Sequence, residues 1–196
     1  MSNVSLWASS FGDDYTVRNE RDYTPRKSFW KHILNKTMPA RILEIGCNTG
    51  MNLGIIADIS WTTECWGVDV NQKSINTAHV RHKEANIVRA SGLELPFRDQ
   101  YFDLVFTAGV LIHQRPEEVD VLMQEVIRVS SQYVLAVEYS AEVFEEVPYH
   151  GKTEALFRGP FGDIYSGRYG LKMLEYGKLD KREGFDDCDY WLLSTY

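Results

Sequence analysis

Two acids and a glycine-containing turn have the clearest chemical potential in this sequence. The stretch "RILEIGCNTGMN" at 41–52 places Glu44 in an apolar run, just before a turn that holds Gly46 and Gly50. Glycines allow a sharp turn and close approach of a ligand, because no Cβ atom stands in the way. Asn48, between them, tolerates left-handed dihedral angles better than most side chains. A carboxylate before this turn would repel a pyrophosphate and favours a cationic ligand.

A second acid ends the next apolar run. Asp69 follows Gly50 by nineteen positions, and its two oxygens could accept hydrogen bonds from both hydroxyls of a ribose. The same side chain could instead cap a helix or be solvated. A dinucleotide is disfavoured, because the fingerprint G-x-G-x-x-G would require glycines where Asn48 and Met51 stand.

His113 is the candidate catalytic residue. It closely follows the apolar run at 102–109, at the edge of the expected sheet where Glu44 and Asp69 also lie. An unperturbed imidazole pKa near ~6.5 suits a general base. The histidine could instead hydrogen-bond a loop carbonyl and shape the pocket, and both interpretations stay open.

A polar and aromatic stretch at 141–170 predicts a lid over a bound substrate, because so long a loop in a compact domain is commonly functional or disordered. Tyr149, His150 and Arg158 are its candidate substrate-binding residues. Arg158 could hold a carboxylate or phosphate in bidentate geometry, although a surface charge on a structural loop is the alternative.

The N-terminal segment is a second candidate for covering the site. Trp7, Phe11 and Tyr15 follow a four-residue spacing, as on one face of a helix. Packing among these rings explains the spacing slightly better than ligand stacking. Tyr15 and Arg18 are nevertheless the candidates for closing the site.

The elements that must position these residues alternate between strands and helices. Apolar runs and turn residues predict strands at 41–45, 64–70, 85–90, 102–109, 133–139, 171–180 and 187–196. Helical spacing predicts helices at 26–36, 51–58, 72–83 (capped by Asn71) and 115–130. This order favours an α/β fold with a doubly wound, Rossmann-like, seven-stranded sheet, mostly parallel, with an antiparallel C-terminal hairpin at its edge.

Composition narrows the class of protein. The chain of 196 residues is 44% hydrophobic, which suits one domain, and its net charge of -7 disfavours nucleic acid as a partner. No apolar run approaches the roughly eighteen residues of a membrane helix. We see no secretory signal, and three widely spaced cysteines suggest a reduced, cytoplasmic protein. No metal site is predicted, because His79 and His82 are not accompanied by a carboxylate and a third imidazole in a metal-ligand pattern.

Four motifs in register resemble the class I S-adenosylmethionine-dependent methyltransferases: "LEIGCNTG", "VDV", "LELPF" and "FDLVFTAGVLIH", within about residues 40–140. The resemblance implies S-adenosyl-L-methionine as cofactor, with Glu44 near its amino end and sulfonium. Gly46 and Gly50 would face the methionine part, and Asp69 the ribose. The other implied cofactor-binding residues are Cys47, Asn48, Val70, Ser91, Gly92, Leu93 and Gly109.

The implied contacts of the adenine ring lie in the loop after the third strand. The backbone of Ser91 and Gly92 would lie near the exocyclic amine, and Leu93 would pack on the ring. Ser91 stands where many family members carry aspartate, and serine can still accept a hydrogen bond. Gly109 would border the methionine end.

A narrower resemblance reaches both ends of the chain. "FGDDYTVRN", "GVLIH", "EVPYHGK" and "GFDD…YWLL" are similar to the pseudaminic acid biosynthesis-associated methylases. It implies a single methyltransferase domain at 1–196 in four segments. These are an N-terminal helical cap (1–36), a cofactor-binding core (37–140), an acceptor lid (141–170) and a C-terminal hairpin (171–196).

The expected activity is methyl transfer to oxygen or nitrogen of a polar small molecule. A sugar or nucleotide-linked sugar is the expected acceptor, and an acidic sugar would suit Arg158. The alternatives are a catalytically silent partner protein with a cofactor fold, or a methyltransferase of protein or nucleic acid. The oligomeric state and the methylated atom are not indicated by the sequence.

Overall fold

The computed structural model describes residues 3–196, which form two helical layers around one mixed sheet. The sheet has seven strands in the order β3-β2-β1-β4-β5-β9-β8. Their bounds are β1 (Arg41–Ile45), β2 (Glu64–Asp69), β3 (Asn86–Arg89), β4 (Phe102–Ala108), β5 (Ser130–Glu138), β8 (Lys172–Leu179) and β9 (Cys188–Ser194). Strands β1 to β5 pair in parallel, and β9 pairs antiparallel with both β5 and β8. The predicted fold class is confirmed.

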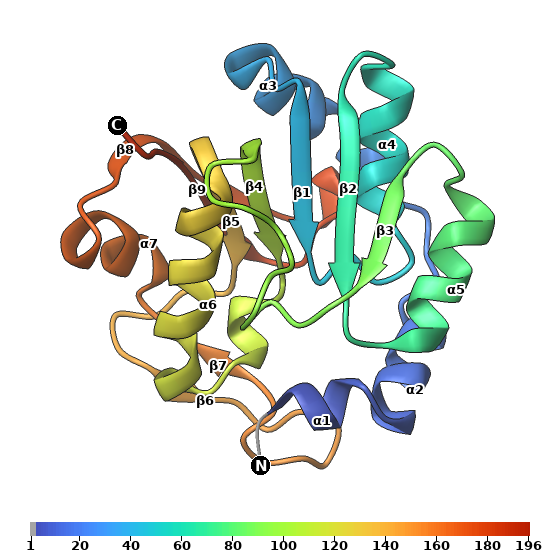
Figure 1. Cartoon of the computed structure of the whole chain (residues 1–196). Helices are drawn as coiled ribbons and strands as arrows, with labels where there is room; N and C mark the ends of the chain where they lie inside the picture. Colours follow the sequence, from blue (N-terminus) through green and yellow to red (C-terminus); the bar gives the residue numbers. More distant parts are fainter. Residues whose placement is uncertain (1–2) are drawn as a thin grey trace.

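Helices cover both faces of this sheet. On one face lie α3 (Lys27–Thr37), α4 (Met51–Ile59) and α5 (Gln72–Arg81). The other face is covered by α6 (Pro116–Val129), the short α7 (Phe161–Asp163) and the π-helical turn η3 (Ile164–Arg168) (Figure 1). The expected cap of α5 is confirmed, since Asn71 Oδ1 accepts a hydrogen bond from the backbone N–H of Ser74 at 2.9 Å.

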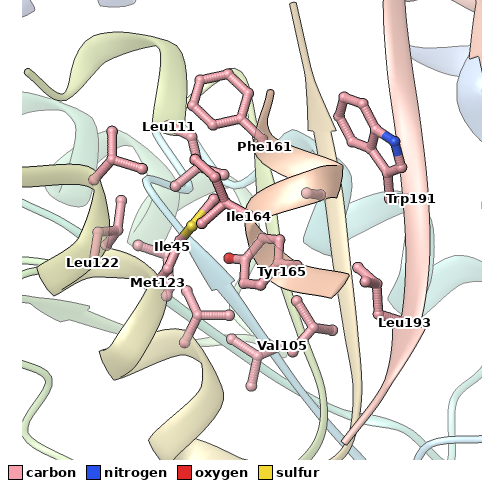
Figure 2. Packing of buried hydrophobic residues seen from close by; sticks show 14 of the residues in the cluster. Ile45, Val105, Leu111, Leu122, Met123, Phe161, Ile164, Tyr165, Trp191 and Leu193 are labelled. Atoms are coloured by element: carbon pink, nitrogen blue, oxygen red, sulfur yellow. The ribbon is translucent and has the colours of Figure 1, made fainter. Parts of the chain in front are cut away.

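The sheet separates two apolar cores. Figure 2 shows the core beneath α6 and η3, where Met123 and Tyr165 pack near Ile45 and Val105. Strand residues alternate between the two faces. Leu43 and Ile45 therefore belong to this core, while Ile42 belongs to the core under α3 and α4. Glu44 follows the alternation of Ile42 and points beneath α3 and α4.

Smaller elements cross the carboxyl ends of the parallel strands, at the lower edge of the sheet in Figure 1. They include α1 (Asn3–Trp7), α2 (Ser10–Arg18) and the ribbon of β6 (Glu145–Glu146) with β7 (Phe157–Arg158). Three 3-10 turns complete the chain: η1 (Thr24–Arg26), η2 (Leu111–His113) and η4 (Lys181–Glu183).

Three segments differ from the sequence expectation. Residues 161–168, expected in the lid, instead form α7 and η3, and Phe161, Ile164 and Tyr165 pack in the core under α6. The aromatic residues at the N-terminus do not lie on one helix, because α1 ends at Trp7 and α2 begins at Ser10. Ser9 caps α2 by accepting a hydrogen bond from the N–H of Phe11 at 3.3 Å. Strand β5 begins at Ser130, three residues before the expected start at Tyr133, since Ser130 still pairs with Phe102 across a bulge. No helix in the described part of the chain is long and apolar enough to cross a membrane.

Candidate active site

A cavity of about 220 Å³ opens at the carboxyl ends of β1, β2, β4 and β5. This edge is where ligands bind in open α/β sheets. The loops after the strands supply residues 44–49, 69–71, 90–93 and 108–110, and α1 and α2 supply part of the roof. The cavity therefore brings together the strand-end residues singled out in the sequence, with Gly50 as the exception.

The turn after β1 adopts the left-handed backbone expected from its residue types. The φ angles of Gly46, Asn48 and Gly50 are 69°, 47° and 77°. A Cβ atom on Gly46 would lie 2.5 Å from Cγ2 of Val110, so only glycine fits there. Gly50 instead begins α4 away from the cavity wall, where a Cβ would lie 3.0 Å from Cδ2 of His82.

Asp69 holds the turn and the following helix together. Its Oδ2 accepts from the N–H of Asn48 and its Oδ1 from the N–H of Asn71, both at 2.8 Å. Burial raises the pKa of Asp69, and these N–H donors oppose that rise. Each carboxylate oxygen keeps a second lone pair for a ligand in the cavity. The structural and ligand-binding interpretations of this aspartate are therefore compatible.

Glu44 is a buried acid with one unsatisfied oxygen. Its Oε1 accepts from Nδ2 of Asn52 at 2.6 Å, whereas Oε2 is buried without a partner among the described residues. Burial raises the pKa of Glu44 to about 8, against the opposing effects of the Asn52 hydrogen bond and the Arg26 guanidinium. A buried acceptor without a partner is costly, so a cationic donor in this cavity would be stabilised.

Arg26 is a cavity residue that the sequence analysis missed. Its Nη1 donates to Oδ1 of Asn52 at 2.9 Å, and its Nε donates to the carbonyl of Gly184 at 3.0 Å. The guanidinium lies between the rings of Tyr23 and Phe185, 4.4 and 4.1 Å from their centroids. Nothing local marks Arg26 in the sequence, because its partners come from distant segments.

His113 lies on the short turn η2, packed under the N-terminal helices. Its Nδ1 lies 2.7 Å from the carbonyl oxygen of Ala155, which can only accept, so Nδ1 carries the proton and Nε2 is left as the acceptor. Burial lowers the pKa of His113 to about 4. The loop-carbonyl interpretation is thus observed, and the general-base role stays a prediction.

Glu138, at the end of β5, fixes the turn that carries His113. Its carboxylate accepts from the N–H of Val110 at 3.0 and 3.1 Å and from the N–H of Ile112 at 3.4 Å. Burial raises the pKa of Glu138 to about 7. The sequence analysis did not select this acid, although it ends an apolar run as Asp69 does.

The roof is tied to the strand ends by side-chain hydrogen bonds. Nδ2 of Asn71 donates to the carbonyl of Trp7 at 3.1 Å and to Oδ1 of Asp13 at 2.9 Å. The hydroxyls of Thr16 and Ser74 lie 2.7 Å apart. These contacts hold α1 and α2 against the start of α5, beside Asp69.

A second tie joins the roof to the lid. Nδ2 of the buried Asn3 donates to the carbonyl of His113 at 2.9 Å and to the carbonyl of Glu154 at 2.8 Å. One amide therefore fixes α1, the His113 turn and the 141–170 segment relative to one another.

The candidate substrate-binding residues divide into two groups. Tyr15 and Tyr149 line the cavity. Arg18, His150 and Arg158 are exposed and do not line it, although the guanidinium of Arg18 lies beside Phe11 and interacts with Tyr149. Arg158 extends from the edge of β7, and His150 occupies the tip of the lid turn with a φ of 47°.

The remaining cofactor candidates lie where expected. Cys47, Val70 and Gly109 line the cavity, as do Ser91, Gly92 and Leu93. The backbone N–H of Leu93 donates to Oγ of Ser91 at 3.2 Å, which keeps this loop tight. No group of three metal-ligating side chains occurs within residues 3–196.

Part of the chain that forms this cavity matches a known protein family. Residues 43–133 match the family described as "Methyltransferase domain". This domain family uses S-adenosylmethionine as methyl donor. The match contains the turn, Asp69, the 91–93 loop and His113, so the matched region supplies most of the cavity wall below the roof.

A curated relative matches part of this chain. The fatty-acid O-methyltransferase of Mycolicibacterium smegmatis is 34% identical over 91 residues, which cover 45% of this chain and 32% of that relative. The chain thus matches about a third of the length of this protein.

Solved structures with this fold cover almost the whole chain. One is the 1,6-didemethyltoxoflavin-N1-methyltransferase of Burkholderia thailandensis with bound S-adenosylhomocysteine (TM-score 0.74, 14% identity, covering 97% of this chain and 86% of that one). Another is the magnesium protoporphyrin IX methyltransferase of Synechocystis PCC 6803 with bound SAM (TM-score 0.72, 11% identity, covering 99% and 97%). At these identities the likeness establishes a common fold.

Proposed function

We propose that this protein is an S-adenosylmethionine-dependent methyltransferase acting on oxygen or nitrogen of a polar small molecule. The observation that carries the proposal is the unpartnered, buried Oε2 of Glu44 beside a glycine turn, in a chain with a methyltransferase domain. A ligand with a cationic amino-acid end would satisfy that oxygen. We also propose a cytoplasmic location, supported by three cysteines that remain unpaired.

The residues present fit the cofactor. Glu44 would accept from its ammonium group, and the Arg26 guanidinium, held rigid between two rings, would donate to its carboxylate. Asp69 would accept from the ribose hydroxyls through its free lone pairs, and the loop at 91–93 would border adenine. S-adenosylmethionine supplies an electrophilic methyl group on a sulfonium.

His113 would act on the acceptor. Its Nε2 is the free proton acceptor of a neutral ring, so it can take the proton that an attacking hydroxyl or amine releases. The roof of α1 and α2 would exclude water and hold the acceptor for an in-line displacement. This general-base role is part of the proposal.

A sugar or nucleotide-linked sugar is the acceptor class that we propose. Its support is the resemblance of both chain ends to methylases associated with sialic-acid-like sugar biosynthesis, together with a cavity lined by tyrosine hydroxyls and amides. An acidic sugar has less support than the sequence alone gave it, because Arg158, its expected anchor, does not line the cavity.

Incubation with isotope-labelled S-adenosylmethionine and a panel of free and nucleotide-linked sugars tests the proposal. We expect one sugar class to gain the mass of a methyl group, and His113→Ala to lower turnover without weakening cofactor binding. Cofactor binding without transfer to any small molecule would favour the silent-partner alternative. Transfer only to protein or nucleic acid would replace the acceptor class.

A further inference from the structure

We propose that the cavity beside His113 is a subsite for an uncharged, multiply hydroxylated ring, such as a neutral pyranose, bound against aromatic side chains. This inference rests on the proposed methyltransferase function. It goes further because it excludes an acidic group on the ring that receives the methyl group.

Aromatic rings form the walls of this subsite. The ring of Trp7 lies 4.3 Å from the ring of His113 and 5.1 Å from that of Tyr15, measured between centroids. Tyr149 lies 5.3 Å from His113 on the lid side. All four side chains line the cavity. Such rings offer an apolar face with polar tips, which suits a ring that has C–H faces and hydroxyl edges.

Two polar atoms at the subsite lack partners. The indole Nε1–H of Trp7 is buried with no acceptor, and the amide Oε1 of Gln114 is buried with no donor, within the described part of the chain. Gln114 follows His113, is 9% exposed, and lines the cavity with Trp7. A hydroxyl both donates and accepts, so neighbouring hydroxyls of one ring would satisfy both atoms.

The charges around the cavity disfavour an anion. Among the described residues, the arginines that line it are Arg21 and Arg26. Arg21 is already paired with Asp186 at 3.4 Å, and Arg26 is the proposed partner of the cofactor's carboxylate. An acidic ring would instead meet the carboxylates of Asp186 and Glu138, which line the same cavity. Burial keeps the His113 ring neutral near pH 7, so it offers no positive charge either.

The chemistry of the transfer is compatible with an uncharged ring. A hydroxyl oxygen forms the new C–O bond to the methyl carbon, the C–S bond breaks, and its electron pair stays on sulfur. The hydroxyl proton moves to Nε2 of His113. Neither an oxidant nor a metal ion is needed.

Binding to the full-length protein saturated with S-adenosylhomocysteine tests the subsite, after calorimetry has shown that this product binds. The probes are matched pairs: methyl glucoside with glucuronate, and UDP-glucose with UDP-glucuronate, each measured by saturation-transfer NMR. We expect the neutral member of at least one pair to bind roughly tenfold more tightly than its acid, since the acid is repelled by Asp186 and the cavity-lining Arg21 is already paired with that carboxylate. Phenol serves as the planar aromatic probe.

Substitutions at the two unpaired polar atoms test whether the sugar binds in this subsite. Trp7→Phe retains a ring but removes the orphan indole N–H, and we expect it to weaken the neutral sugar roughly fivefold while S-adenosylhomocysteine still binds normally. Trp61→Phe is the matched control, because Trp61 is 91% exposed and remote from the cavity wall. If Trp7→Phe disturbs folding, Gln114→Leu tests the other orphan atom with the same expected loss.

Several results would overturn the inference. These are equal or tighter binding of the acids, binding of phenol but of no sugar, no binding of either neutral sugar, and unchanged sugar affinity in both variants. Failure of S-adenosylhomocysteine to bind is a different outcome, because it removes the proposed function itself and this subsite with it.

Discussion

At the scale of single residues, Glu44 and Asp69, at the ends of neighbouring strands, differ in how many hydrogen bonds their carboxylates accept. Asp69 receives two backbone N–H bonds, so its charge is supported before any ligand arrives. Glu44 receives one amide N–H and keeps a buried oxygen without a partner. Glu44 is therefore the acid whose protonation should respond most strongly to a cation in the cavity.

The raised pKa of Glu44 predicts that binding of S-adenosylhomocysteine depends on pH. With a pKa of about 8 in the free protein, Glu44 is largely protonated at pH 6, while an ammonium group favours its ionised form. Binding then releases a proton, so affinity should rise with pH between 6 and 7.5, by at most about tenfold per pH unit. Calorimetry in buffers of different ionisation enthalpy measures both effects.

Glu44→Gln is the control for this pH dependence. The amide has the same shape but does not titrate, so the variant should bind more weakly and without proton release in this range. An equally steep pH profile in Glu44→Gln would assign the titration to another group.

Asp69→Ala should weaken the binding of S-adenosylhomocysteine by about 1–3 kcal/mol, because the ribose hydroxyls and two backbone N–H groups lose their acceptor. Asp58→Ala, an exposed acid on α4, is the matched control and should leave affinity unchanged. Calorimetry at one pH gives the comparison. Unaltered affinity in Asp69→Ala would remove this residue from the site.

His113 should titrate near pH 4 and not near 6.5, because burial disfavours its charged form. The unfolded chain would bind this proton first, so His113 should make the fold less stable as pH falls from about 6.5 to about 4, with no effect above that window. NMR titration of labelled imidazoles measures the pKa directly. A pKa of His113 near the unperturbed value of ~6.5 would mean that the ring is solvated.

At the scale of elements, the roof depends on a close contact between α1 and α2. Gly12 lies against the end of α1, where an added Cβ would be 1.9 Å from the carbonyl oxygen of Trp7 and 2.8 Å from Nδ2 of Asn71. These are a backbone atom and the amide that ties the roof to the strand ends. Side chains alone could not relieve this clash.

Gly12→Ala should therefore displace α1 and weaken binding of S-adenosylhomocysteine, while the sheet stays folded. Overpacking of this kind typically costs ~1–3 kcal/mol. Hydrogen exchange of α1 and α2, with calorimetry, checks both expectations. Gly167→Ala is the matched control, since a Cβ there meets nothing within 4 Å. If both variants behave alike, the tight contact at Gly12 does not hold the roof.

The elements also show which features the sequence could predict. Helix α6 and the turn after β1 follow from local chemistry: Pro116 with two acids at a helix start, and Gly46 with Asn48 in left-handed conformation. Arg26 and Glu138 could not be predicted in this way, because their roles arise from partners far along the chain. Arg158 was a candidate for substrate binding by its residue type, but it does not line the cavity. The residue type of a loop position does not predict where its side chain points.

At the scale of the whole molecule, segments from both chain ends close one cavity over residues 43–133, the region that matches the methyltransferase family. Arg21, after α2, pairs with Asp186 in the loop before β9. Asn3 links the roof to the 141–170 segment through the carbonyl of Glu154. Because the cavity is shared by these segments, a ligand that fills it should stabilise the whole chain and not one loop.

Titration of the full-length protein with S-adenosylhomocysteine, followed by calorimetry and by the shift of its thermal unfolding, tests the central claim most directly. We predict one binding site per chain and a Tm that rises with ligand concentration, with both effects weakened in Asp69→Ala. No binding heat and an unchanged Tm at high ligand concentration would contradict the assignment of this cavity to the methyl donor.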